Sequence, residues 1–185
     1  MGDLTRQDSE TLRSGAMDDN AQYLTFSVAK EKFAVDILDI REIIELSLMT
    51  DVPLAPDFIR GIVNLRGSVL PVVDLAVRLG RGEAVFTKRS CIVVVEVKGE
   101  RSQNVGVLVD EVNEILEIPP DCIQPPPNFG EEVKTDFIRA MGRVDESFII
   151  LLNIDKILSL EDLHQLEQLA KMRSGLGANT EKNNE

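Results

Sequence analysis

Short apolar runs rich in Val and Ile recur along this chain, and they limit the folds open to it. The runs are YLTFSV at 23–28, FAVDIL at 33–38, GIVNLRGSVLPVV at 61–73, CIVVVEV at 91–97, NVGVLV at 104–109 and SFIILL at 147–152. Gly, Pro and charged residues separate the runs, which is typical of β-strands joined by turns. The sequence therefore predicts a mostly β protein in which helices are the minority.

The runs also repeat in order along the chain. Phe58 aligned with Phe137 matches FIRGIVNLRGSVLPVVDL to FIRAMGRVDESFIILLNI without a gap, and Phe33 aligned with Val105 matches FAVDILDIREII to VGVLVDEVNEIL. A copy of roughly 65 to 70 residues buries little apolar surface alone, so we expect two small barrels that pack on each other. Chance similarity between Val-rich strands is the alternative. The sequence leaves open whether the first strand of each copy stays in its own barrel or crosses into the other.

The repeat sets the domain boundaries that we expect. One domain spans 21–158, and its two barrels occupy approximately 21–85 and 88–158. Residues 1–20 and 174–185 are polar and lack a periodic apolar pattern, so we expect both to be disordered tails.

Residues 159–173 carry the clearest helical pattern. Ser159 is suited to be the N-cap, and Asp162 stands three residues later, where the acid of a capping box belongs. Four leucines follow a three-residue rhythm, namely Leu160, Leu163, Leu166 and Leu169. We expect a C-terminal amphipathic helix that lies on the body of the protein.

Composition excludes several classes of function. With 185 residues and 43% apolar content, the chain can bury a core. Its formal net charge is −12, and Lys and Arg are interspersed with Asp and Glu, which argues against a nucleic-acid partner. No long apolar segment or signal peptide appears, so we expect a cytoplasmic protein without direct membrane insertion. Cys91 and Cys122 are too few for a disulfide framework and lack metal-ligand spacing.

The motifs of common enzymes are missing from the sequence. It has no Gly-rich phosphate loop, no paired Cys and His, and no G-x-S-x-G elbow. His164 stands among Glu and Gln on the predicted helix, where nothing would tune it as a phospho-acceptor or a general base. The prolines at 125–127 suit a stiff inter-strand loop or, alternatively, a polyproline ligand. We therefore expect no catalytic residue, cofactor or metal.

Arg66 stands inside an apolar run and needs a partner. Read as a single strand, the run places on one face the residues Ile62, Asn64, Arg66 and Ser68. A guanidinium at the entrance to a core is costly unless carboxylates or carbonyls hold it. Glu42, inside DILDIREII, is the candidate for an ion pair; the alternative is that Arg66 ties down the turn at Gly67 through backbone carbonyls. In the repeat, Arg66 corresponds to Asp145, and this change of charge suggests a site rather than a requirement of the fold.

The same residues resemble the central signature of the CheW-type chemotaxis coupling proteins. The positions that match the signature are Pro56, Phe58, Gly61, Asn64, Leu65, Arg66, Gly67, Pro71, Val73, Asp74 and Leu75. YLTFSVAKEKFAVDILDIREI is similar to the family's first hairpin, and NVGVLVDEVNEILEI is similar to a later strand and turn. CIQPPPNFG, FIRAMGRV and ILLNIDKIL resemble its C-terminal third. The resemblance spans roughly 21–158, but residues 81–89 and those after Leu158 follow no pattern of the family.

The resemblance implies a fold, a function and a site. The implied fold is two SH3-like five-stranded β-barrels side by side, with short helices. The implied function is a non-catalytic adaptor that binds the cytoplasmic signalling tip of chemoreceptors and the regulatory domain of the histidine kinase CheA, and that is recruited to membrane-associated arrays. The receptor-binding groove lies between the barrels, and its positions here are Ile40, Glu42, Gly61, Asn64, Arg66, Gly67, Val112 and Ile115, with Glu42 and Arg66 as an ion pair.

A small-ligand-binding β-barrel is the alternative function. In that case the cleft between the barrels would hold a metabolite. Ligand pockets usually rely on aromatic walls with a few polar groups. The chain has 4% aromatic residues and no Trp, so the composition favours the adaptor.

Overall fold

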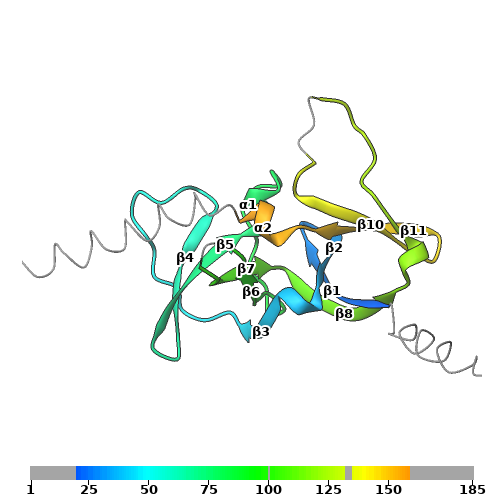
Figure 1. Ribbon diagram of the computed structural model, residues 1–185. Helices are drawn as coiled ribbons and strands as arrows, with labels where there is room; N and C mark the ends of the chain where they lie inside the picture. Colours follow the sequence, from blue (N-terminus) through cyan, green and yellow to red (C-terminus); the bar gives the residue numbers. More distant parts are fainter. Residues whose placement is uncertain (1–19, 100, 132–134, 159–185) are drawn as a thin grey trace, which may run out of the picture.

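The computed structural model describes residues 20–99, 101–131 and 135–158 (Figure 1). The predicted helix at 159–173, the predicted tail at 174–185 and all of the N-terminal tail except Asn20 lie outside these described residues. Two β-sheets make up most of the described chain, and they lie side by side in Figure 1. The mostly β prediction is confirmed.

The five-stranded sheet has the order β3-β6-β7-β5-β4. Its strands are β3 (Ile40–Glu45), β4 (Ile59–Leu65), β5 (Ser68–Asp74), β6 (Cys91–Val97) and β7 (Gln103–Val109). The six-stranded sheet has the order β8-β1-β2-β11-β10-β9. Its strands are β1 (Ala21–Val28), β2 (Glu31–Asp36), β8 (Glu111–Ile118), β9 (Ile123–Gln124), β10 (Ile138–Val144) and β11 (Ser147–Leu152). Two sheets of this size agree with the predicted pair of SH3-like barrels.

Short helices close each copy of the repeat. Helix α1 (Leu75–Arg78) begins after Asp74, whose carboxylate accepts hydrogen bonds from two backbone N–H groups of the first turn. Helix α2 (Ile154–Ile157) begins after Asn153, whose side chain caps it in the same way. Two 3-10 turns, Ile37–Asp39 and Pro120–Cys122, complete the elements. Within the described part of the chain, no helix is long and apolar enough to cross a membrane.

The first hairpin of each copy crosses to the opposite sheet. Strands β1 and β2 join the C-terminal strands, and β2 runs parallel to β11. Strands β6 and β7, from the second copy, join strands β3, β4 and β5 of the first copy, and β7 runs parallel to β5. Each sheet therefore takes strands from both 21–85 and 88–158, so the two contiguous stretches of sequence do not coincide with the two sheets. Local residue patterns fix where strands occur but not which strand each one pairs with.

The strand register reproduces the internal repeat. In the five-stranded sheet Val72 faces Gly106, and in the six-stranded sheet Leu151 faces Ala34. These are the positions that the two sequence alignments make equivalent. A β-bulge follows Ile59 in β4, and another stands at the equivalent place in β10. The duplication is therefore visible in backbone geometry as well as in residue type.

Most of the apolar core lies between the two sheets. Alternate residues of a strand point to opposite faces, so Val93 and Val95 of β6 enter this shared core while Ile92 and Val94 fill the interior of their own barrel. The side chains of β1 alternate in the same way, and Leu24 and Phe26 point into the shared core. Smaller clusters fill the two barrel interiors. The central strands are buried on both faces, which explains their continuous runs of Val and Ile.

Candidate functional site

Arg66 lies in a turn and not in a strand, so its predicted place on a strand face is wrong. Strand β4 ends at Leu65 and β5 begins at Ser68, and these two residues face each other across the hairpin. Arg66 has φ 51° and Gly67 has φ 85°, as a tight two-residue hairpin turn requires. The Asn64 side-chain oxygen accepts a hydrogen bond of 2.8 Å from the Gly67 N–H. The prediction failed because β5 is buried at consecutive positions from Leu70 onward, so its continuous apolar run shows no break in alternation that would mark the turn.

The Arg66 side chain pairs with Glu42 in a two-point geometry. Its Nη1 donates to Oε1 at 2.9 Å and its Nη2 donates to Oε2 at 2.7 Å. Parallel hydrogen bonds of this kind fix direction as well as distance. The hydrogen bonds and the charge of Glu42 raise the pKa of the Arg66 guanidinium, which stays charged at any physiological pH. The Arg66 side chain is 74% exposed and that of Glu42 is 28% exposed, so the pair stands at the surface.

This ion pair joins the two outer strands of the five-stranded sheet. Glu42 belongs to β3 at one edge, and the Arg66 turn is the tip of the β4–β5 hairpin at the other edge. In the other barrel, the repeat places Glu114 at the position of Glu42 and Asp145 at that of Arg66. Asp145 also has a positive φ, of 53°, but two acids cannot form this pair. The pair is therefore not a requirement of the barrel.

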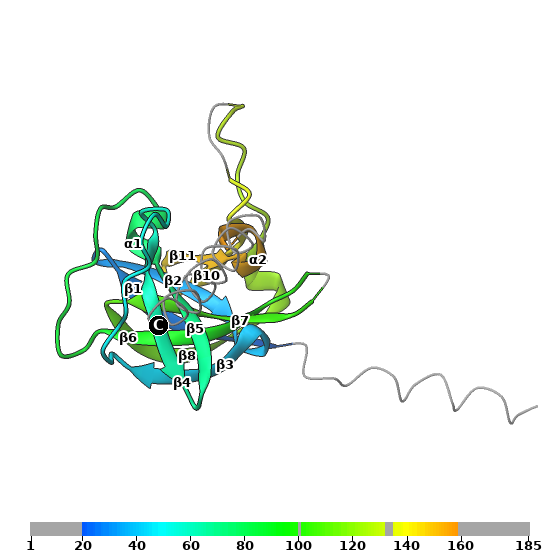
Figure 2. The same cartoon turned by 90° about the vertical axis from the view of Figure 1, so that its left-hand side faces the viewer.

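Strands β3 and β8 present matching apolar residues from the two sheets. Ile40 and Val112 are equivalent under the repeat, and each is half-buried against the shared core between the sheets. Ile43 and Ile115 are also equivalent, and they are 47% and 53% exposed. Among the described residues, each of the two strands pairs with a single neighbour and is an edge strand of its sheet. Both views place β3 and β8 near each other on one side of the molecule (Figures 1 and 2).

Gly61 serves the fold and does not lie on this surface. It is buried in β4 at the bulge, with φ 151°. A Cβ at this position would stand 2.6 Å from the Thr50 carbonyl oxygen. That carbonyl accepts a hydrogen bond from the Ile62 N–H at 2.9 Å and anchors the preceding loop to β4. The sequence pattern could not show this burial, because it depends on a residue outside the strand.

The remaining predicted residues fall into two adjoining groups. Asn64, Arg66 and Gly67 form the exposed hairpin tip, which the ion pair joins to Glu42 on β3. Ile40, Val112 and Ile115 form an apolar strip along the two edge strands. The prediction omitted Ile43, although the repeat had already matched it to Ile115. It also omitted Val69 and Phe148, which occupy equivalent positions on β5 and β11 and are 66% and 56% exposed.

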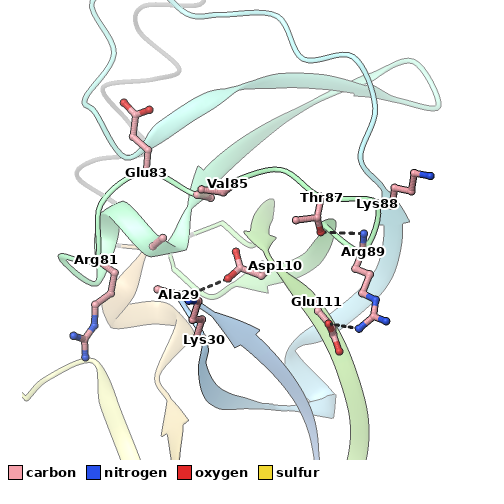
Figure 3. A pocket seen from close by; sticks show the side chains of 12 residues that line it. Ala29, Lys30, Arg81, Glu83, Val85, Thr87, Lys88, Arg89, Asp110 and Glu111 are labelled. Atoms are coloured by element: carbon pink, nitrogen blue, oxygen red, sulfur yellow. Dashed lines mark hydrogen bonds and ion pairs between the residues drawn. The ribbon is translucent and has the colours of Figure 1, made fainter.

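A cavity of about 810 Å³ opens away from these residues, beside the segment that joins α1 to β6 (Figure 3). Ala29 and Asp110 form a hydrogen bond across it at 2.7 Å, and Arg81 and Lys88 stand at opposite edges with their side chains pointing away. None of the predicted site residues and no aromatic ring lines it. The space between the sheets is filled by the shared core. The lining of this cavity therefore lacks the aromatic walls on which small-ligand pockets usually rely.

Comparison with known proteins decides the family. A model of the CheW-like domain matches residues 22–162. This chain belongs to the CheW-like domain family. The CheW protein of Klebsiella aerogenes is 31% identical over 150 residues, with 81% of this chain and 89% of the relative covered. A probable CheW of Rhizobium etli is 36% identical over 138 residues, with 75% of this chain and 87% of the relative covered.

A solved structure and a relative of a different name agree with this assignment. The crystal structure of the scaffolding protein TtCheW from Thermoanaerobacter tengcongensis has a TM-score of 0.69 and 34% identity, and the match covers 77% of this chain and 95% of that one. FrzA of Myxococcus xanthus is 34% identical over 140 residues, covering 74% of this chain and 84% of FrzA. The CheW-like domain has a scaffold or adaptor role in chemotaxis signalling, and family membership supports a role without catalysis.

Stability measurements should separate the residue that serves the fold from those at the surface. Gly61→Ala should lower the free energy of unfolding by about 1 to 3 kcal/mol, because the new Cβ overpacks against the Thr50 carbonyl. Arg66→Ala should change it much less, because exposed ion pairs contribute little. Urea denaturation of both variants provides the test. Equal losses would contradict the assignment of Arg66 to the surface.

Proposed function

We propose that this CheW-like chain is a non-catalytic adaptor that couples chemoreceptors to the histidine kinase CheA. The receptor's cytoplasmic signalling tip would bind along β3 and β8 and beside the Arg66 turn. The observation that carries the proposal is the matched apolar strip: two edge strands from opposite sheets each present one half-buried and one exposed aliphatic residue. The finer binding roles come from the family resemblance, and the strip is consistent with them.

The chemistry of the strip suits a helical partner. A helical hairpin tip offers an apolar stripe with polar flanks, and such helices dock into grooves through side chains spaced by one turn. Ile43 and Ile115 would supply exposed contact area, with Ile40 and Val112 beneath them. Docking there would cover apolar surface that is otherwise in contact with water.

The ion pair would orient the partner. Glu42 holds the Arg66 guanidinium in one direction, yet 74% of the Arg66 side chain remains exposed to a partner. Charges at the rim of an interface contribute discrimination and association rate more than affinity. We therefore assign Arg66 the role of selecting the register of the receptor helix, and Glu42 the role of positioning Arg66.

The kinase would use a different surface of the barrels, so that one adaptor can hold both partners in an array. Phe148 is exposed on β11, in the other sheet from the Arg66 turn, and is a candidate for this second surface. Recruitment of a cytoplasmic adaptor to membrane-associated arrays would then follow from receptor binding alone.

Co-purification with separate partners tests the class of function. The full chain would be mixed in one experiment with a receptor cytoplasmic-tip fragment and in another with the CheA regulatory domain. We expect both to be retained. If neither partner is retained and metabolites raise the melting temperature of the protein, the adaptor function is wrong and the small-ligand alternative is favoured.

Adding charge to the strip should disrupt receptor binding without unfolding the protein. Ile115→Asp should weaken binding of the receptor tip by about tenfold or more, because a carboxylate would be desolvated in the interface. The melting temperature should hardly change, since Ile115 is already 53% exposed. Val85→Asp is the matched control, because Val85 is 76% exposed and lies outside the strip. A collapse of stability in Ile115→Asp would place this residue in the core.

A double-mutant cycle should show that Arg66 and Glu42 act as a unit in receptor binding. Arg66→Ala and Glu42→Ala should each weaken binding by roughly 2- to 10-fold, and the double variant should be no worse than Arg66→Ala alone. The reason is that Glu42 acts through the position it gives to Arg66. Calorimetric titration with the receptor tip provides the dissociation constants. If the losses of binding free energy in the two single variants simply add in the double variant, Glu42 does not act through Arg66.

A further inference from the structure

Strand β3 lies at an edge of the five-stranded sheet, and burial specifies its position weakly. In the described part of the chain it pairs with β6 alone, and none of its residues is fully buried. Ile44 packs against the barrel interior, and its neighbour Ile43 is 47% exposed. A slip by one residue would still supply the interior with an isoleucine, although it moves every side chain of the strand to the opposite face. The register of β3 therefore needs a second determinant.

Two ion pairs join the start of β3 to the end of β6. The Asp39 carboxylate, directly before β3, lies 3.3 Å from the Lys98 ammonium, directly after β6. The Arg41 guanidinium pairs with the Glu96 carboxylate. The two acids are only 16% and 23% exposed, so each depends on its cation. A shift of β3 by two residues would bring acid beside acid or base beside base, which destabilises a pair of strands.

The Arg41 ion pair also holds a β-bulge in place. The pairing of β3 with β6 shifts between Ile40 and Glu42, so Arg41 is the extra residue. A bulge changes the direction of the side chains beside it. The residue that follows this bulge is Glu42, whose carboxylate accepts two hydrogen bonds from Arg66. A slip of β3 by one residue would put Arg41 in the place of Glu42 and set two guanidinium groups side by side.

Asp39 is also held from the six-stranded sheet. It ends the 3-10 turn Ile37–Asp39, through which the chain crosses from β2 in one sheet to β3 in the other. Arg139 of β10 lies 3.9 Å from the Asp39 carboxylate and 3.3 Å from that of Asp36, which caps the same turn. Lys98 approaches Asp39 from the five-stranded sheet. A cation from each sheet therefore fixes the point where β3 begins.

The equivalent strand β8 is held by other means. Ile118 at its end is 1% exposed, so burial fixes its position. The Thr25 hydroxyl donates to the Glu114 carbonyl at 2.8 Å and accepts from the Glu114 N–H at 3.1 Å, next to the irregularity in this pairing. In the repeat, Arg41 corresponds to Asn113, which carries no charge. Control of the register by ion pairs is therefore particular to β3.

We propose that Asp39 and Arg41 are positioning residues, which fix the register of β3 on β6 through their two ion pairs. This register keeps Glu42 within reach of Arg66 and decides which side chains β3 presents at the surface. The register itself follows from the described contacts, whereas its effect on a receptor tip rests on the proposed function. Neither positioning residue needs to contact the receptor.

Charge reversal and re-pairing in the full chain test this role. Arg41→Glu sets two acids side by side, so the β3 amides should exchange with deuterium about tenfold faster. The cross-strand NMR contact between the backbones of Ile43 and Val93, which face each other, should weaken as well. Adding Glu96→Arg restores an ion pair of reversed polarity. The double variant should therefore regain the exchange rates and the NMR contact of the unmodified protein.

Arg81→Glu is the matched control for added negative charge. Arg81 pairs with Glu31, and these side chains are 50% and 47% exposed, against 49% for Arg41. The change of charge is the same, but neither residue belongs to β3 or β6. Exchange of the β3 amides should stay at the rate of the unmodified protein.

The same variants separate the register from the receptor proposal. Arg41→Glu should weaken binding of a receptor cytoplasmic-tip fragment about fivefold, and Glu96→Arg should restore it. Restoration by a change on β6 would show that residue 41 acts through the register and not by touching the receptor. If exchange responds as expected but all variants bind the tip equally, the assignment of the register stands and the receptor surface on β3 is wrong.

Three results would overturn the positioning role. One is unchanged exchange of the β3 amides in Arg41→Glu. Another is equal acceleration in Arg81→Glu, which would show a general effect of charge. The third is a double variant that exchanges as fast as Arg41→Glu alone, because re-pairing would then have no influence on the strand.

Discussion

The apolar core between the two sheets is the interaction on which the rest of this structure depends. It receives alternate residues of β1, β2, β5, β6, β7 and β11, and it buries the face of the central strands that points away from their own barrel interior. The exchanged hairpins reinforce it, because each sheet is completed by strands from the other copy of the repeat. Neither sheet would retain its strands or its buried face if the other were absent. We therefore regard the two barrels as one folding unit, in which separation of the sheets and unfolding are the same event.

The proposed receptor surface is a direct consequence of that arrangement. Strands β3 and β8 follow equivalent hairpins, and near its start each places an aliphatic residue, Ile40 or Val112, beside the shared core. The strip on the surface is thus the margin of the core, and its geometry is fixed by the packing beneath it. The duplication explains why two sheets offer the same kind of residue to one partner. The Glu42–Arg66 pair breaks this symmetry, because the other barrel has two acids at the equivalent positions.

Much of this could be predicted from sequence, for reasons that differ between elements. The strands and the repeat were visible because burial on both faces leaves long runs of Val and Ile, and the equivalence of Ile40 with Val112 followed from the alignment alone. The Arg66 turn was missed because β5 is buried on both faces, so its residues form a continuous apolar run in which the change of phase at the turn is not visible. Gly61 was misplaced because its burial depends on the Thr50 carbonyl, which no local pattern records. The hairpin exchange was left open because strand pairing is decided by long-range packing.

The most direct test of the account is an NMR titration of the full-length, isotopically labelled chain with a receptor cytoplasmic-tip fragment. The account predicts that the largest backbone shift changes occur together in β3 and β8 and at the turn formed by residues 64–67. These segments come from two sheets and meet only in the folded protein. Shift changes confined to one of the two strands, or centred on the 46–58 loop with β3 and β8 unchanged, would contradict the proposal that the receptor binds across the margin of the shared core.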